Sequence, residues 1–281
     1  MPVSRSAGRW PDLSVDLALE PEPVDWTRPW YDAVRPAYAR LGQGPLIEAL
    51  NRASAAHALH NAAGQPLRFV PQSALPEGVA YEAFIGATGN VPTRDNLHDF
   101  FNALVWLTFP RIKVQLNALQ AAQIALAGVG KSRGPARDAA TIFDENAALL
   151  VVTDDDTGRA HVAALRNHDW YSALYAGRAR FGPQAQVWSF GHALMEKLVA
   201  PRKAITAHTR VLYAPADFFA LSFDERRAWI DATVSAQLRD EELATASFTP
   251  LPVLGVPGWW EGQDEAFYAD ATVFRPKRRT E

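Results

Sequence analysis

The sequence predicts an α+β fold in which helices are in the majority and a small antiparallel sheet lies in the second half of the chain. Helix-like patterns bounded by Pro and Gly fill most of the first half, whereas the better strand-like runs come after residue 147. No internal repeat or linker divides the sequence. We therefore expect one domain over residues 29–281, preceded by an extended arm over residues 1–28 that is rich in Pro and charged residues.

Each helix expected in the first half is limited by residues that break or end helices. Pro36 should kink or split the first helix, and Pro110 separates the last two. Gly64 and Gly89 follow the second and third, and a short strand is expected over Leu67–Gln72. The helical ranges are Trp30–Leu41, Leu46–Ala63, Ala80–Ala87, Asn96–Thr108 and Pro110–Ala127.

The spacing of apolar residues changes from Ala148 onward. The run ALLVVT, the turn DDDTG and the run RAHVAAL together predict a β-hairpin over Ala148–Leu165. The sequence SFDE at Ser222 is a capping box and opens the last helix. The later elements are helices over Asn167–Ala176 and Gln184–Val199, a strand over Ala204–Tyr213, and a helix from Ser222 to Arg239.

Composition excludes several classes of site. The chain has 281 residues, a net charge of −3 and no cysteine, so disulfides, thiolate nucleophiles and cysteine metal ligands are absent. The near-balanced charge gives no global basic surface for duplex nucleic acid, and we do not expect a nucleic-acid partner. No run reaches the roughly 20 apolar residues of a membrane span, and none resembles a signal peptide. We therefore expect a soluble, cytoplasmic protein without a membrane partner.

Three strings carry a resemblance to a known family. They are VPTRDNLHDFFNALVWLTFPRIKVQLN, FDENAALLV and GHALMEKLVAPRKAITAH. The sequence, from about Tyr81 to the PGWW segment, resembles an uncharacterised bacterial family, the domain-of-unknown-function family three-thousand-and-twenty-five. The resemblance implies a bacterial source and one family-wide domain. It brings no established activity and no catalytic residues, so candidate residues have to come from the sequence itself.

The helix expected from Asn96 opens with two groups able to move protons. His98 and Asp99 lie in its first turn, where an aspartate is also favoured by the helix dipole. Asn102 interrupts the apolar run FFNALVWL and needs hydrogen-bond partners if it is buried. It could bond to His98, one turn earlier, and fix the tautomer of the ring. The alternative is that all three residues are structural.

Polar side chains form a stripe on the following helix. Lys113, Asn117 and Gln120 are spaced i, i+4 and i+7 on a helix that is otherwise apolar and rich in Ala. A solvated face would explain this pattern, although two amides are unusual there. If the two helices fold back at Pro110, the stripe and His98 could border one cleft, where the stripe would orient a substrate.

Acidic residues come directly before the strand at Ala148. Asp144, Glu145 and Asn146 could bind a cation or act as bases at the mouth of the strand, and we take Glu145 as a candidate catalytic residue. The same residues are also common in turns and caps.

A metal site is the last candidate. His192 and Glu196 are one helical turn apart. If this helix packs on the next strand, we expect His208 of that strand to lie beside His192, because the two residues are about equally far from the turn that joins helix and strand. Two histidines and one carboxylate suit zinc, iron or manganese. Arg210 shares the strand face of His208 and could contact the substrate. The alternative is an ion pair between His192 and Glu196, with His208 in the core.

These residues predict two different functions. One is a hydrolase-type enzyme that uses a His and carboxylate site, with or without a metal, on a small polar substrate. The other is a non-catalytic module that binds a protein or nucleic acid through Trp259, Trp260 and the basic RPKRR segment. An enzyme should gather its histidines and carboxylates in one pocket, whereas a binding module should expose the two tryptophans. The sequence predicts neither the substrate nor the oligomeric state.

Overall fold

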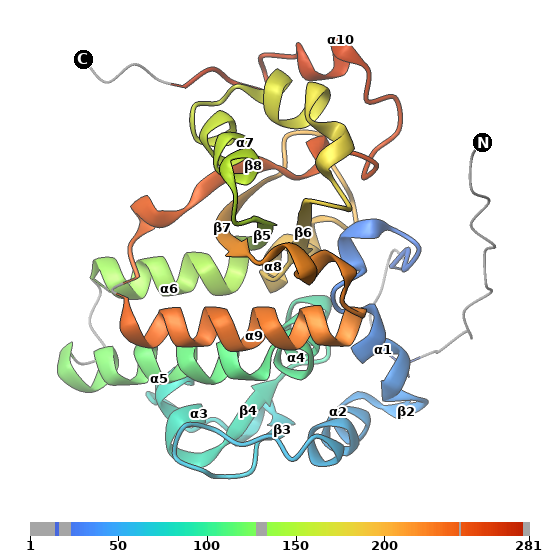
Figure 1. The fold of residues 1–281 in the computed structure, drawn as a ribbon. Helices are drawn as coiled ribbons and strands as arrows, with labels where there is room; N and C mark the ends of the chain where they lie inside the picture. Colours follow the sequence, from blue (N-terminus) through green and yellow to red (C-terminus); the bar gives the residue numbers. More distant parts are fainter. Residues whose placement is uncertain (1–14, 17–23, 128–133, 242, 278–281) are drawn as a thin grey trace.

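The computed structural model describes residues 15–16, 24–127, 134–241 and 243–277 (Figure 1). The expected α+β class with a helix majority is confirmed. The α-helices are α1 (Arg35–Leu41), α2 (Leu46–Ala56), α3 (Tyr81–Thr88), α4 (Leu97–Thr108), α5 (Pro110–Ala127), α6 (Pro135–Asn146), α7 (Asp156–Arg166), α8 (His192–Lys197), α9 (Phe223–Asp240) and α10 (Glu265–Tyr268). The strands are β1 (Val15–Asp16), β2 (Gly44–Pro45), β3 (Arg68–Pro71), β4 (Asn90–Thr93), β5 (Ala147–Thr153), β6 (Ala185–Ser189), β7 (Thr206–Ala214) and β8 (Thr249–Pro252).

The main sheet lies in the second half, as expected, but it is mixed. Its strand order is β6-β5-β7-β8, and the central pair β5 and β7 is parallel, so the prediction of an antiparallel sheet was wrong for that pair. Every residue of β5 is buried. Leu149 and Val151 pack into the main core, whereas Leu150 and Val152 pack into a second cluster on the opposite face. A strand covered on both faces reads as a continuous apolar run.

The expected hairpin over Ala148–Leu165 was wrong in its second half. β5 forms, but RAHVAAL is part of helix α7. Asp155 caps this helix by accepting a hydrogen bond from the backbone N–H of Gly158 at 2.8 Å. His161, Val162 and Leu165 are buried on one face, which is helical spacing. The acidic run DDD, which was expected to form a hairpin turn, therefore lies at the start of a helix.

Two further expectations for the second half were wrong in part. The range Gln184–Val199 holds strand β6 and the short helix α8, because Trp188 and Val187 lie in the sheet beside β5. Asn167 ends α7, and a π-helical segment follows only at Tyr171–Ala176. The strand β7 and the helix α9, with its capping box at Ser222, are confirmed.

Helix α4 is the central helix of the first half. Almost all of its residues are buried, including Phe100, Phe101 and Trp106, which explains why most of its sequence is apolar. The predicted start at Asn96 and end at Thr108 are confirmed, and the side chain of Asn96 caps the helix. The limits expected for α3, α5 and β3 are confirmed within one residue, whereas α2 ends earlier, at Ala56.

The junction between α4 and α5 is held by α9, which packs beside α5 (Figure 1). The backbone N–H groups of Arg111 and Ile112 donate to the carboxylate of Asp231 at 3.2 and 3.0 Å. Arg227 donates to the carbonyl of Thr108 at 2.8 Å. These contacts satisfy backbone groups that the break before Pro110 leaves without helical partners. They fix the direction in which α5 leaves α4.

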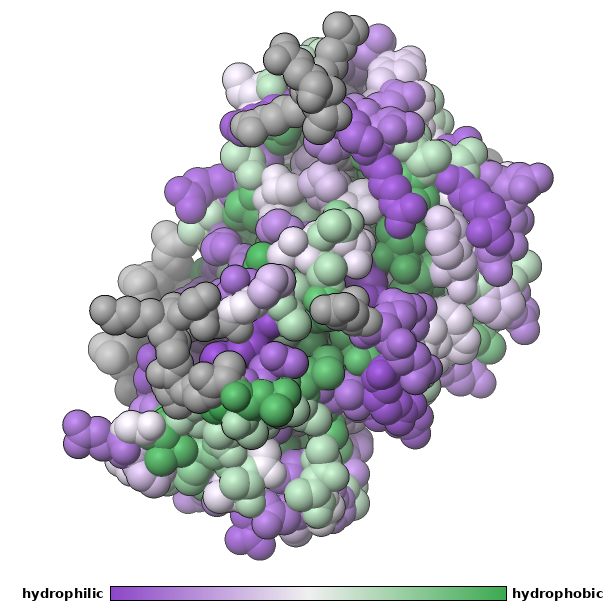
Figure 2. All heavy atoms as spheres, turned by 90° about the vertical axis from the view of Figure 1, so that its left-hand side faces the viewer, coloured by the Kyte–Doolittle hydropathy of each residue, from purple (hydrophilic) through white to green (hydrophobic). Residues whose placement is uncertain are grey.

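Some expectations fall outside the described residues. The N-terminal arm over residues 1–28 lies largely there, as do residues 128–133 of the segment GVGKSRGP. In the part of the chain that is described, no helix has the length and apolar character needed to cross a membrane. Figure 2 shows hydrophobic residues in several separate places among hydrophilic ones on the face at the left of Figure 1.

We predict that Asp231→Leu lowers the free energy of unfolding by about 2–4 kcal/mol, because the buried N–H of Ile112 and the partly buried N–H of Arg111 lose their acceptor. Asp231→Asn keeps one acceptor oxygen and should lose about 1 kcal/mol. Urea denaturation measures both. The exposed Asp240 of the same helix serves as the control, and Asp240→Leu should change stability by less than about 0.5 kcal/mol. Equal losses at the two positions would contradict the role given to Asp231.

Candidate functional site

A cavity of about 610 Å³ lies where several helices of the first half meet α6 and α8. Polar side chains dominate its wall. They come from the 3-10 turn Gln72–Ala74, α3, the loop before α4, α4, α5, α6 and α8, and they are Gln72, Tyr81, Glu82, Arg94, His98, Asp99, Asn102, Gln120, Arg137, Thr141, Asp144, Glu145 and His192.

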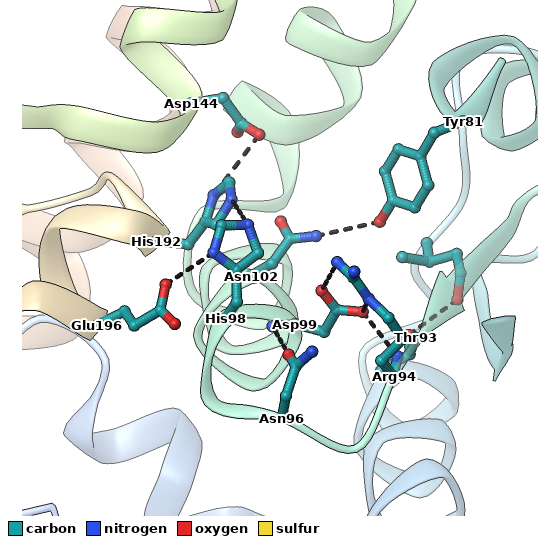
Figure 3. A network of polar contacts seen from close by, with 11 residues as sticks. Tyr81, Thr93, Arg94, Asn96, His98, Asp99, Asn102, Asp144, His192 and Glu196 are labelled. Carbon is teal, nitrogen blue, oxygen red and sulfur yellow. Dashed lines mark hydrogen bonds and ion pairs between the residues drawn. The ribbon is translucent and has the colours of Figure 1, made fainter.

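Two histidines face each other at this cavity (Figure 3). The Nε2 atoms of His98 and His192 are 3.1 Å apart, and the rings are nearly perpendicular, at 86°. The outer nitrogen of each ring faces a carboxylate. Nδ1 of His98 lies 2.8 Å from Oε2 of Glu196, and Nδ1 of His192 lies 3.7 Å from Oδ2 of Asp144. The side chain of His98 is 34% exposed and that of His192 is 6% exposed, so His98 is the ring that a ligand can reach.

The number of ring protons decides which of these contacts are hydrogen bonds. Each of three contacts needs one N–H to be a hydrogen bond. They join Glu196 to His98, His98 to His192, and His192 to Asp144. Two neutral rings supply only two. We assign one to Nδ1 of His98, which donates to Glu196, and one to Nε2 of His192, which donates to His98. Nδ1 of His192 is then bare, which agrees with its 3.7 Å separation from Asp144 and its lack of a hydrogen bond.

Gly191 places His192 next to the end of α6. A Cβ at Gly191 would lie 2.4 Å from the carbonyl oxygen of Glu145 and 2.5 Å from the nitrogen of Ala147. Its own N–H donates to the carbonyl of Ala147 at 2.8 Å. Only glycine allows the backbones to approach this closely, so Gly191 keeps His192 beside Asp144.

A buried ion pair lies behind the histidines. Nζ of Lys113 donates to Oδ1 of Asp144 at 2.5 Å and to Oδ1 of Asn102 at 2.8 Å. The amide nitrogen of Asn102 in turn donates to the hydroxyl of Tyr81 at 3.1 Å. The ion pair therefore joins α5, α6 and α4, and the amide extends the network to α3. The sequence suggested a hydrogen bond between Asn102 and His98, but it is not formed. The ring of His98 binds Glu196 instead.

The pKa values of this cluster follow from burial and from Lys113. Burial is the largest effect on Asp144 and by itself would raise its pKa, but the charge and the hydrogen bond of Lys113, together with the two nearby histidines, outweigh burial, and the pKa lies below its ordinary value. Burial lowers the pKa of His192 to about 4, against the opposing effect of Asp144. Near neutral pH His192 is therefore neutral and Asp144 is ionised.

Two other acidic side chains of the wall are occupied by structural contacts. Asp99 accepts hydrogen bonds from the backbone N–H of Arg94 at 2.6 Å and from its guanidinium at 2.9 and 3.0 Å. Asn117 donates to the carboxylate of Glu82 at 2.6 Å. Burial raises the pKa of Glu82, although Lys113 opposes this shift. In contrast, Glu145 has no hydrogen bond or ion pair with its side chain among the described residues.

The structure brings together all four residues expected to be catalytic. His98, Asp99, Asn102 and Glu145 all line the cavity. Of the polar stripe on α5, Gln120 lines the cavity, whereas Lys113 and Asn117 lie behind its wall and bind other side chains. The prediction that this stripe and His98 border one cleft therefore applies to Gln120.

The predicted metal trio of His192, Glu196 and His208 is not formed. Glu196 and His192 contact His98 instead, and His208 is exposed on β7 with its ring 6.1 Å from that of Phe248. Within the described residues, no group of three or more His, Cys, Asp or Glu side chains is arranged to hold a metal ion. His208 was expected beside His192 on the assumption that residues 184–199 form one helix packed on β7. The range is not one helix, and α8 packs against α4 and α6.

Arg210 also lies away from the cavity. Its Nε donates to Gln237 at 3.0 Å and its Nη2 to Glu241 at 2.7 Å, so it connects β7 to the end of α9. The prediction that Arg210 contacts a substrate in this site was therefore wrong.

Sequence reasoning missed several residues of the wall. Tyr81 and Glu82 come from the first turn of α3, and Arg137 and Thr141 come from α6. The signal for α6 was present in PARDAATIFDEN, where Arg137, Thr141 and Asp144 are spaced i, i+4 and i+7. No such pattern identifies Tyr81, which the fold alone brings to Asn102.

A family model described as "Protein of unknown function (DUF3025)" matches residues 67–278, and the chain belongs to this family. The match confirms the family that the three sequence strings resemble. No curated protein and no solved structure matches the chain. The description of the family names no activity.

We predict that Lys113→Met lowers the free energy of unfolding by about 3–5 kcal/mol, because it leaves the buried charge of Asp144 without a partner. Adding Asp144→Leu should recover at least about 2 kcal/mol, since the double variant removes both charges. Urea denaturation of both single variants and the double variant measures the coupling. Additive losses would contradict a direct interaction between the two side chains.

We also predict a specific pH dependence for His192. Its pKa is about 4 in the folded protein against an ordinary 6.5, so the unfolded chain binds more protons between these values. The stability present above pH 6.5 is therefore lost as the pH falls towards 4. Relative to His192→Gln, the wild-type protein should lose roughly 3 kcal/mol between pH 7 and pH 4. Parallel stability curves from urea denaturation would contradict the shift.

Proposed function

We propose that this member of the DUF3025 family is a hydrolase-type enzyme in which His98 transfers protons to and from a small polar molecule bound in the cavity. The observation that carries the proposal is the row Glu196, His98, His192 and Asp144, in which a partly exposed ring is oriented by a carboxylate. A general base needs such an orienting group, because it fixes the tautomer and stabilises the charge that the ring gains.

The proposed roles follow from accessibility. A substrate group bound in the cavity next to the two histidines replaces His192 as the partner of Nε2 of His98. This exchange costs about one hydrogen bond, or ~1 kcal/mol. Nε2 then accepts the substrate proton, while the Nδ1 proton stays on His98 and donates to Glu196. His192 remains neutral, and its N–H is free to donate to the bound molecule. Glu145 is the second acid or base, because no cation or hydrogen bond among the described residues occupies its carboxylate.

The alternative is a binding module that uses Trp259 and Trp260, and it requires both tryptophans to be exposed. The structure does not show this exposure. Both tryptophans are partly buried against the main core, and the ring of Trp260 stacks 6.5 Å from that of Trp30. Arg275 and Lys277 are exposed, whereas residues 278–281 of the basic segment lie outside the described range. Partial burial of the two rings favours a packing role, so the cavity remains the better candidate for function.

The proposal predicts that one activity depends on His98 and Glu145. We would incubate the wild-type protein with panels of small chromogenic esters, amides and phosphoesters and with a bacterial metabolite extract followed by mass spectrometry. For the reaction found, His98→Gln and Glu145→Gln should each lower kcat/KM by about 100-fold to 10,000-fold, because each removes a proton-transfer group.

The control is His208→Gln, which changes an exposed histidine that does not line the cavity and should leave the rate within about twofold. A pH profile of the wild-type rate should follow a group that must be deprotonated to act as base. An activity that His98→Gln leaves unchanged would refute the assignment.

A further inference from the structure

Helix α6 presents more than Asp144 and Glu145 to the cavity. Arg137, Thr141, Asp144 and Glu145 all line it, and they are spaced i, i+4, i+7 and i+8, which places them on one face of the helix. Seven residues separate Arg137 from Asp144, or roughly 10 Å along the helix axis. The cavity therefore has two ends, with the histidine pair at one and Arg137 at the other.

Among the described residues, no hydrogen bond or ion pair engages the guanidinium of Arg137. Its Nε and Nη1 atoms are buried and form no hydrogen bond. No ion pair among the described residues involves it, although other arginines of the chain, such as Arg94 and Arg210, are paired. Glu241 borders the space on the other side of Arg137, but its carboxylate is held by Arg210 at 2.7 Å. A buried cationic group that lacks a partner costs free energy unless a ligand supplies one.

Uncharged donors lie beside Arg137. Gln120 is only 8% exposed and lines the cavity, yet no hydrogen bond engages its amide within the described residues. The hydroxyl of Thr141, one turn along α6, is likewise without a partner in that part of the chain. An unpartnered guanidinium, amide and hydroxyl together can supply several N–H and O–H donors to one acceptor group.

We propose that Arg137, Gln120 and Thr141 form an anion subsite, and that the molecule bound in the cavity carries a carboxylate or a phosphate roughly 10 Å from its reacting bond. The inference rests on the proposed function for the position of the reacting bond, but the subsite itself does not depend on it. Three acidic groups of the wall are held by other side chains, Glu82 among them by Asn117, and the fourth, Glu145, lies about two helical turns from Arg137. Asp144 is neutralised by Lys113 and Asp99 by Arg94.

The location of the unpaired acid supports this orientation. Glu145 stands eight residues from Arg137, at the histidine end of the same helix face, so an anionic group is repelled there and attracted to Arg137. A small molecule with one anionic end therefore has a preferred direction in the cavity. The reacting end meets His98, and the anionic end meets the guanidinium.

The test uses inorganic phosphate and acetate as probes, each titrated into the full-length protein and followed by NMR chemical shifts. We expect saturable binding of at least one of them. Arg137→Gln should weaken it at least tenfold, and Arg137→Lys should weaken it less, because it keeps the charge but loses the planar fork. Tighter binding of phosphate identifies a phosphorylated substrate, and tighter binding of acetate identifies a carboxylate substrate.

Arg159→Gln is the matched control, because Arg159 is an exposed arginine of α7 that pairs with Asp154 and does not line the cavity. It should bind both probes as the wild type does, and thermal unfolding shows whether each variant is folded. Failure of both anions to bind to the wild type, or equal weakening in Arg159→Gln and Arg137→Gln, would overturn the subsite.

The variant His98→Gln separates this inference from the proposed function. It should bind the probe anion with unchanged affinity, because His98 is not part of the subsite. Anion binding in a protein whose activity is insensitive to His98 would leave the subsite standing and refute the proposed function. An activity that depends on His98 in a protein that binds neither anion would support the proposed function and refute the subsite.

Discussion

The buried ion pair between Lys113 and Asp144 is the interaction on which the arrangement of the site depends. Lys113 donates to Asp144 and to Asn102, so one ammonium group joins three helices at the back wall of the cavity. Without it, burial would raise the pKa of Asp144 and favour a neutral carboxylic acid. With it, a carboxylate stays ionised 3.7 Å from His192. The ion pair therefore sets the electrostatic surroundings of both histidines.

The charge on Asp144 and the burial of His192 act in opposite directions. Burial is the larger effect and lowers the pKa of His192 to about 4, so this ring stays neutral while it contacts His98. A neutral ring that can donate from Nε2 or accept there is a suitable neighbour for a ring that gains and loses a proton. Glu196 provides the counter-charge on the other side of His98. The two carboxylates thus stand at opposite ends of the histidine pair.

Much of the first half could be predicted from local signals, because caps, prolines and glycines limit its helices. Asn96, Pro110 and Gly89 mark the ends of elements that the structure contains. The second half was harder. Tertiary packing made β5 a central strand with helix α7 after it, and an acidic cap was mistaken for a turn. His98 and Glu145 could be chosen from local sequence, because His98 lies beside Asp99 in the first turn of a helix and Glu145 comes just before a buried strand. The pairing of His98 with Glu196 and of His192 with Asp144 could not be predicted, since these side chains meet only through the packing of α6 and α8 against each other and of α8 against α4.

The account can be tested most directly by measuring the protonation of the two rings. Long-range proton–nitrogen NMR spectra of ¹⁵N-histidine-labelled protein at pH 7 distinguish the Nδ1–H and Nε2–H tautomers. We expect His192 to be neutral with its proton on Nε2 and His98 to carry a proton on Nδ1, and His98→Gln should shift the Nε2 resonance of His192. A His192 ring protonated on Nδ1 alone, with resonances that His98→Gln does not move, would contradict a hydrogen-bonded pair and the catalytic role based on it.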